Sequence, residues 1–162
     1  MIILTVDGEP TAWMRPGYNH KTGAVYDQQK KEKEQVRWQL RAQMKENPLS
    51  VPLELDFIFY FGVPKSTSAP RRKDMLQDKI HHMIKPDNDN CQKYLLDCMT
   101  GVIYVDDCQV VDIHARKVYG DSPRTVICVR PLSSCTYKGN EKFEGLPLFE
   151  EGEEWPGDGD KV

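Results

Sequence analysis

The chain has 162 residues, of which 39% are hydrophobic, so it is long enough for one domain with a substantial core. It contains no apolar run near the roughly 18–20 residues of a membrane span, and its apolar start is too short for a signal peptide. A membrane protein and a secreted precursor are therefore not expected. The net charge of −3 by itself argues against a nucleic-acid partner, because phosphate groups attract positive charge.

The charge is unevenly distributed along the chain. Residues 141–162 hold eight acids and two bases, a net charge of −6, whereas residues 1–140 hold 20 bases and 17 acids, a net charge of +3. The pattern predicts a mildly basic domain over residues 1–133 and a flexible acidic tail over residues 134–162. The total charge is thus an average over two different parts, and a nucleic-acid partner stays open.

Alternating apolar residues predict a first strand at residues 2–6, and an ordered loop with several Gly and Pro turn signals is expected over residues 9–24. A highly charged helix is predicted over residues 27–47, because Val36 and Leu40 begin a narrow apolar stripe at helical spacing.

Residues 51–62 predict a long strand with one strongly buried face, because every second residue is large and apolar. Residues 64–84 are polar and basic, and no element is predicted there. A second helix is predicted over residues 88–99, with Asp87 as the N-cap and Gly101 after the end.

Three further strands are predicted over residues 102–105, 109–119 and 124–130. The expected order is therefore β-α-β-α-β-β-β. This order indicates a small single α+β domain in which two main helices pack on a mixed sheet.

The chain contains five cysteines, an odd number, and no two of them form a C-x-x-C pair. This usage predicts reduced thiols in a cytoplasmic protein.

Two acidic pairs flank the second predicted helix. Asp87 and Asp89 lie at its start, and Asp106 and Asp107 follow the strand predicted over residues 102–105. A short antiparallel return after the helix would bring the two pairs together. Carboxylates that share a small volume repel one another unless a cation lies among them, and Mg²⁺ or Mn²⁺ prefers such oxygen ligands. A metal site is therefore predicted.

Lys93 lies four residues after Asp89 and four residues before Asp97, so the three side chains share a helix face. A lysine beside metal-bound carboxylates is suited to stabilising negative charge on a phosphate. The structural alternative is that the acids cap the helix and form a turn, while Lys93 forms an ion pair within the helix.

The segment KPDNDNCQKYLLDCMTGVIYVDDCQVV, residues 85–111, resembles the RusA family of Holliday-junction resolvases. Gly8-x-Pro10, Arg15-Pro16 and Tyr119-Gly120 also fit the flanks of that family, and the resemblance covers roughly residues 1–131. It implies a small α+β fold, a homodimer, and cleavage of four-way DNA junctions with Mg²⁺, for which Mn²⁺ is a possible substitute.

The resemblance assigns roles by position. It implies that Asp87, Asp89, Lys93 and Asp107 are catalytic, and that the metal ligands are Asp87, Asp89, Asp106 and Asp107. The implied function is a structure-selective endodeoxyribonuclease that resolves junctions by paired symmetric nicks in DNA recombination and repair. Two alternatives remain: a nuclease selective for flaps or other branched DNA, and a non-catalytic DNA-binding protein of the same fold.

Basic residues that precede the acidic motif are the candidates for DNA-backbone contact: Arg71, Arg72, Lys73, Lys79 and Lys85. The lysines of the first predicted helix, Lys30, Lys31 and Lys33, are further candidates for DNA contact, with a solvated face as the favoured alternative, because they alternate with acids. Trp13 and Tyr18 are candidates for base stacking at an opened junction, with ordinary packing as the favoured alternative.

One apolar island interrupts the acidic tail. It resembles the short peptides with which bacterial replication and repair proteins bind the sliding clamp, and its pocket-filling residues would be Leu146, Leu148 and Phe149. Folding back on the domain is the alternative for the island. The acidic tail as a whole is expected to compete with DNA for the basic domain. The family resemblance places the protein in the cytoplasm of a bacterial or phage-infected cell.

Overall fold

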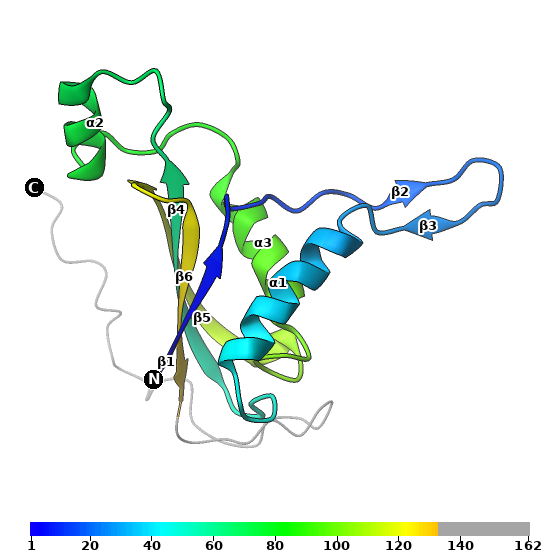
Figure 1. The fold of residues 1–162 in the computed structure, drawn as a ribbon. Coiled ribbons are helices and arrows are strands. Elements are labelled where there is room, and N and C mark those ends of the chain that lie inside the picture. The colour runs from blue at the N-terminus through cyan, green and yellow to red at the C-terminus, as the bar shows by residue number, and fades with distance from the viewer. Residues whose placement is uncertain (133–162) are drawn as a thin grey trace, which may run out of the picture.

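The structure is a computed structural model that describes residues 1–132. Helices α1 (Lys30–Gln43) and α3 (Asn88–Met99) lie on one side of a four-stranded sheet (Figure 1). The sheet has the strand order β1-β6-β4-β5 and consists of β1 (Ile2–Asp7), β4 (Leu53–Gly62), β5 (Val110–Gly120) and β6 (Arg124–Pro131). The β4–β5 pair is parallel and the other pairs are antiparallel. The predicted α+β class with a mixed sheet is confirmed, whereas the predicted tail and its clamp-docking residues lie outside the described residues.

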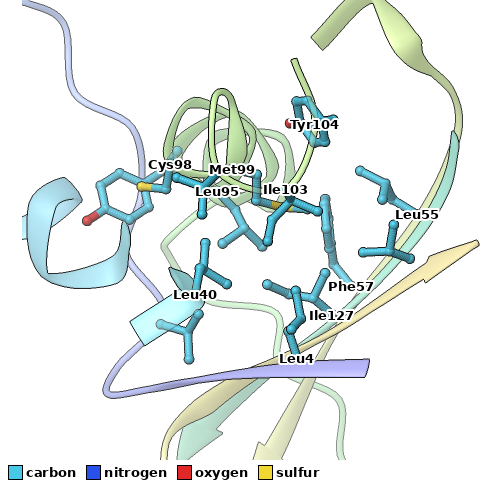
Figure 2. Packing of buried hydrophobic residues seen from close by; sticks show 14 of the residues in the cluster. Leu4, Leu40, Leu55, Phe57, Leu95, Cys98, Met99, Ile103, Tyr104 and Ile127 are labelled. Atoms are coloured by element: carbon cyan, nitrogen blue, oxygen red, sulfur yellow. The ribbon is translucent and has the colours of Figure 1, made fainter. Parts of the chain in front are cut away.

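The core lies between the sheet and the two helices. Every second residue of β4, from Leu53 to Phe61, is buried, as its alternating sequence predicts. α3 covers this face with Leu95, Cys98 and Met99, which pack with Phe57 and other sheet residues (Figure 2). The buried apolar surface of α3 therefore determines where the two ends of this helix lie.

Cys91 and Cys98 belong to this packed face of α3. Both are buried, and neither forms a disulfide. Burial raises the pKa of the Cys91 thiol to about 11 and that of the Cys98 thiol to about 12, so both are protonated and pack as small apolar groups.

α1 also lies along the edge strand β1. Gln43 accepts a hydrogen bond from the Thr5 backbone N–H at 2.9 Å and donates one to the Thr5 carbonyl at 2.6 Å. Gln39 forms the same pair of bonds with Asp7, at 2.7 and 3.3 Å. These two amides occupy backbone groups that an edge strand would otherwise offer to solvent or to another chain.

The strand predicted over residues 102–105 is wrong. α3 ends at Met99 with Thr100 as its C-cap, Gly101 has a φ of +74°, and the chain then turns. Val102, Ile103 and Tyr104 are buried, and Tyr104 takes part only in isolated bridges. The apolar run therefore reflects side chains that fill the core and not a strand paired along its length.

A short helix and a two-stranded hairpin were not predicted. Helix α2 (Ala69–Leu76) lies within the polar segment 64–84, and its Pro70 occupies the first turn, where proline is tolerated. Strands β2 (Gly17–Tyr18) and β3 (Val25–Tyr26) form a hairpin that projects from the domain (Figure 1). Among the helices of residues 1–132, none is both long and apolar enough to span a membrane.

A buried glutamine ties the turn after α3 to the segment that precedes β4. Gln109 is 1% exposed, and its amide nitrogen donates to the carbonyls of Leu49 at 3.0 Å and Val51 at 2.9 Å. Its amide oxygen accepts from the backbone N–H groups of Val105 at 3.0 Å and Asp106 at 2.9 Å. All four hydrogen-bonding positions of the side chain are thus used.

Replacing Gln109 by alanine should lower the free energy of unfolding by about 2–4 kcal/mol, because four backbone groups lose their partner. Urea denaturation measures this change. Gln35→Ala, at an exposed position of α1, is the matched control and should change stability by less than about 0.5 kcal/mol. A Gln109→Ala variant as stable as this control would contradict the interpretation.

Candidate active site

The start of α3 is held against β5. Asp87 is the N-cap residue, and the carbonyl of the preceding Pro86 accepts a hydrogen bond from the Lys117 ammonium at 2.8 Å. The side-chain amide of Asn88 donates to the Ala115 carbonyl at 3.0 Å. Two contacts from one strand therefore position the first turn of the helix, which carries the first acidic pair.

Asp87 and Asp89 have exposed carboxylates that neither accept a hydrogen bond from any described residue nor form an ion pair with one. The backbone N–H groups of the first helical turn favour negative charge at this place. A cation can therefore bind these carboxylates without breaking an internal contact. The chemistry and exposure of the pair fit the divalent metal that the sequence predicts.

Lys93 lies one turn further along α3, and its ammonium is 3.8 Å from the ring centroid of Trp13. It forms no ion pair within residues 1–132, because the carboxylate of Asp97 is instead 2.9 Å from the Lys33 ammonium. The structural alternative, in which Lys93 pairs with an acid of its own helix, is therefore wrong for the described chain.

The second acidic pair lies beyond the other end of α3. Asp106 caps the 3-10 turn η1 (Asp107–Gln109), and one of its carboxylate oxygens accepts the Cys108 N–H at 3.0 Å. This hydrogen bond lowers the pKa of Asp106. Asp106 thus has a structural role, as the turn alternative predicted, and its role as a metal ligand stays a prediction.

Asp107 is exposed and lines a pocket of about 340 Å³. Asp97 and Thr100, near the end of α3, lie on the same wall. α1 and the residues before it complete the pocket with Asp27, Lys30, Lys33 and Arg37. Asp107 therefore lies in a mixed-charge depression at the far end of α3.

The two acidic pairs are separated by the length of α3. The helix has 12 residues, which at 1.5 Å per residue corresponds to about 18 Å. Within residues 1–132, no three of the four predicted carboxylates have ligand atoms within 4.8 Å of one another. The expectation that a short return brings the pairs together is therefore wrong for a single chain, and their catalytic and metal-binding roles stay predictions.

A different group of potential metal ligands was missed by sequence reasoning. Glu54, Asp56 and His114 have ligand atoms within 4.8 Å of one another. They lie on the sheet face away from the helices, since the buried residues of β4 alternate with Glu54 and Asp56. That alternation is the signal by which the acids could have been found, whereas the proximity of His114 follows only from the β4–β5 register.

An arginine already neutralises much of this cluster. The guanidinium of Arg130 is 2.7 Å from Glu54 and also forms an ion pair with Asp56. The hydrogen bond from Arg130 lowers the pKa of Glu54. The cluster has suitable ligand atoms, but a metal would have to displace Arg130 or share the two carboxylates with it.

The predicted DNA-contact residues lie on and after α2. Arg72 is 3.1 Å from Asp121, and Lys79 is 3.8 Å from Asp74, both in exposed ion pairs. The other three are exposed: Arg71, Lys73 and Lys85. Neither their exposure nor these ion pairs tests the predicted contact with DNA.

A domain of this fold, with exposed carboxylates and a lysine at one helix start, has the groups that a phosphodiester-cleaving enzyme uses. The sequence model of the endodeoxyribonuclease RusA family matches residues 7–130, so the chain belongs to the RusA family of endodeoxyribonucleases. The resemblance seen in residues 85–111 is confirmed.

A relative in Bacillus subtilis (strain 168) is described as uncharacterized protein YqaN. It is 33% identical to this chain over 139 residues, which cover 82% of the chain and 98% of YqaN. The similarity thus extends over nearly the whole relative.

Lys33 joins α1 to α3 and to the segment before α1. It is buried, and its ammonium lies 3.0 Å from Asp27 and 2.9 Å from Asp97, so the prediction of a solvated face is wrong for this residue. Burial opposes the charge of Lys33, but the hydrogen bonds to Asp97 and Asp27 outweigh it and raise its pKa. The Gln29 backbone N–H and Lys33 lower the pKa of Asp27.

Because folding lowers the pKa of Asp27, its charge stabilises the protein above the unfolded pKa, and this contribution is lost as the pH falls through the lower folded value. Asp27→Asn should therefore reduce the free energy of unfolding at pH 7, by no more than about 1 kcal/mol for this partly exposed group. The difference from wild type should shrink below about pH 4.

Denaturation curves at pH 7 and pH 3 check this dependence. Glu34→Gln, an exposed acid of α1, is the control and should show no such change. A difference for Asp27→Asn that is the same at both pH values would contradict the ion-pair interpretation.

Proposed function

We propose that this chain is a Mg²⁺-dependent endonuclease that resolves four-way DNA junctions by paired symmetric nicks in recombination and repair. The observation that carries the proposal is the pair Asp87 and Asp89, which are exposed and have no hydrogen-bond or ion-pair partner for their carboxylates within residues 1–132, one turn before Lys93. This group lies within the segment matched by the RusA family. Its chemistry is that of metal-assisted phosphodiester hydrolysis.

Asp87 and Asp89 would hold the metal together with Asp107. When bound, Mg²⁺ supplies an activated water and neutralises charge on the phosphate. Lys93, one turn further along α3, would stabilise the negative charge that develops on the phosphate oxygens. Mn²⁺ has similar ligand preferences and would substitute for Mg²⁺.

A homodimer would bring the proposed catalytic acids together, although they are separated by the length of α3 within one chain. We propose that Asp107 of one copy lies beside Asp87 and Asp89 of the other copy. Two-fold symmetry then creates two equivalent sites, as the two symmetric nicks require.

The DNA backbone would contact the basic residues on and after α2. Arg71, Lys73 and Lys85 are exposed for this purpose. The exposed ion pairs of Arg72 and Lys79 are worth about 0–1 kcal/mol each, so a phosphate can replace their acidic partners.

The alternative functions differ in substrate or in activity. A nuclease for flaps or other branched DNA would use the same residues. A non-catalytic binding protein would have no need of two exposed acids one turn before Lys93. Cleavage assays on a four-way junction, a flap and a linear duplex, each with and without Mg²⁺, discriminate among the three. The proposal requires Mg²⁺-dependent cleavage with preference for the four-way junction.

Two further proposals rest on sequence alone, because their residues lie outside the described part of the chain. We propose that Leu146, Leu148 and Phe149 bind a bacterial sliding clamp, and that the acidic segment discourages non-specific DNA binding. The first is supported by the apolar island within the acidic segment, and the second by the net charge of −6 over residues 141–162.

Asp89→Asn should abolish cleavage of the four-way junction and leave junction affinity equal or higher, because it removes a metal ligand and a negative charge near DNA. Single-turnover cleavage and gel-shift titration measure the two effects. Glu46→Gln, at an exposed position between α1 and β4, is the control and should cleave normally. Undiminished cleavage by Asp89→Asn would remove Asp89 from the metal site.

Mixing two inactive variants tests the shared site. In a heterodimer of Asp89→Asn and Asp107→Asn, one site carries both substitutions and the other carries neither. Mixed dimers should therefore regain Mg²⁺-dependent nicking at one site, whereas each variant alone stays inactive. If each site belonged to one chain, every site in the mixture would be defective and no activity would return.

A further inference from the structure

Trp13 is held firmly across the starts of α1 and α3. Its backbone N–H donates to the Asn90 carbonyl of α3 at 2.9 Å. The flanking residues are held by Gln29, which is 4% exposed: its amide nitrogen donates to the Ala12 carbonyl at 2.8 Å, and its amide oxygen accepts the Met14 N–H at 2.7 Å. Three hydrogen bonds thus hold three consecutive residues in place.

The Trp13 ring is partly buried against the core, and the Lys93 ammonium lies over one of its faces at 3.8 Å from the centroid. An ammonium at this distance is attracted by the negative face of the ring. The covered face is therefore not available for a DNA base. This arrangement argues against the idea that Trp13 stacks on an opened junction and supports a role through Lys93.

Lys93 would otherwise have two acidic neighbours on its own helix. Asp89 and Asp97 lie four residues before and after it, the spacing at which helical ion pairs form. Asp97 forms an ion pair with Lys33 at 2.9 Å, and the Lys93 ammonium lies over the Trp13 ring. The acid and the lysine therefore each have a partner from another part of the chain.

We propose that Trp13 is a positioning residue that holds the Lys93 ammonium away from the carboxylates of α3 and presents it to the phosphate of the substrate. This inference rests on the proposed function of Lys93. An ammonium over a ring keeps N–H donors for a phosphate, because a ring face occupies only one side of the group. It also leaves Asp89 without an ammonium partner in the described part of the chain, so that its carboxylate is open to a metal.

Trp13→Leu keeps an apolar side chain but removes the ring. It should lower the single-turnover cleavage rate of a four-way junction by about three- to tenfold, which corresponds to the usual strength of such a contact. Junction affinity should change by less than about twofold, because Trp13 acts through Lys93 and not through DNA. Trp13→Phe, which retains a weaker ring face, should lie between Trp13→Leu and wild type.

A double-mutant cycle separates positioning from general damage. In a Lys93→Ala background, Trp13→Leu should cause no further loss of rate, because the group that it positions is absent. Trp38→Leu is the matched control: Trp38 is 69% exposed on α1, and its replacement should leave the rate unchanged. If Trp13→Leu does not fold, as judged by its melting temperature, the same cycle is made with Trp13→Phe.

The contact itself has a signature that does not depend on activity. In NMR spectra, the ring current of Trp13 should shift the ε-methylene protons of Lys93 upfield. Trp13→Leu should remove this shift, and Trp38→Leu should retain it. The absence of the shift in the wild-type protein would overturn the inference even if the enzyme is active.

Failure of the proposed function and failure of the positioning role give different results. A wild-type protein that cleaves no branched DNA with Mg²⁺ would refute the proposed function, and with it the catalytic purpose of the contact. A wild-type protein that cleaves junctions, with a Trp13→Leu variant that cleaves equally fast, would refute only the positioning role. An equal loss from Trp13→Leu with and without Lys93 would also refute it.

Discussion

The packing of α3 on the sheet determines where the candidate catalytic groups lie. Its buried face, including Leu95, Cys98 and Met99, belongs to the core, so the helix cannot slide or turn without exposing apolar surface. Both ends emerge into solvent, one beside Asp87 and the other near Asp107. The core therefore separates the acids by a helix length, and for this reason the proposed metal site requires a second copy of the chain.

Partners distinguish structural acids from candidate catalytic acids. Glu54 and Asp56 share Arg130, and Asp27 and Asp97 share Lys33. Among residues 1–132, no such cation pairs with the carboxylates at the start of α3, and Lys93 of the same helix lies over a tryptophan ring instead. Nearby like charges are stabilised by a cation, so these carboxylates are the ones for which a metal is proposed.

Much of the fold was predictable because the spacing of apolar residues and the turn residues indicate individual strands and helices. The alternation in β4 and the turn at Gly101 identified a strand and a helix end correctly. Local patterns failed where side chains serve the core without regular backbone pairing, as at residues 102–105. They also failed at α2, where eight residues with one buried side chain, Met75, give little periodic signal.

For the site, the sequence by itself determined which residues are the candidates for the chemistry: two acidic pairs and a lysine, within the segment that matches the RusA family. Only the tertiary structure decided which of them lie together. It separated Asp87 from Asp107 and placed Trp13 against Lys93, 80 positions along the chain. The physical reason is that such contacts follow from how helices pack on a sheet, which buries apolar surface over the whole domain and leaves no trace in the spacing of nearby residues.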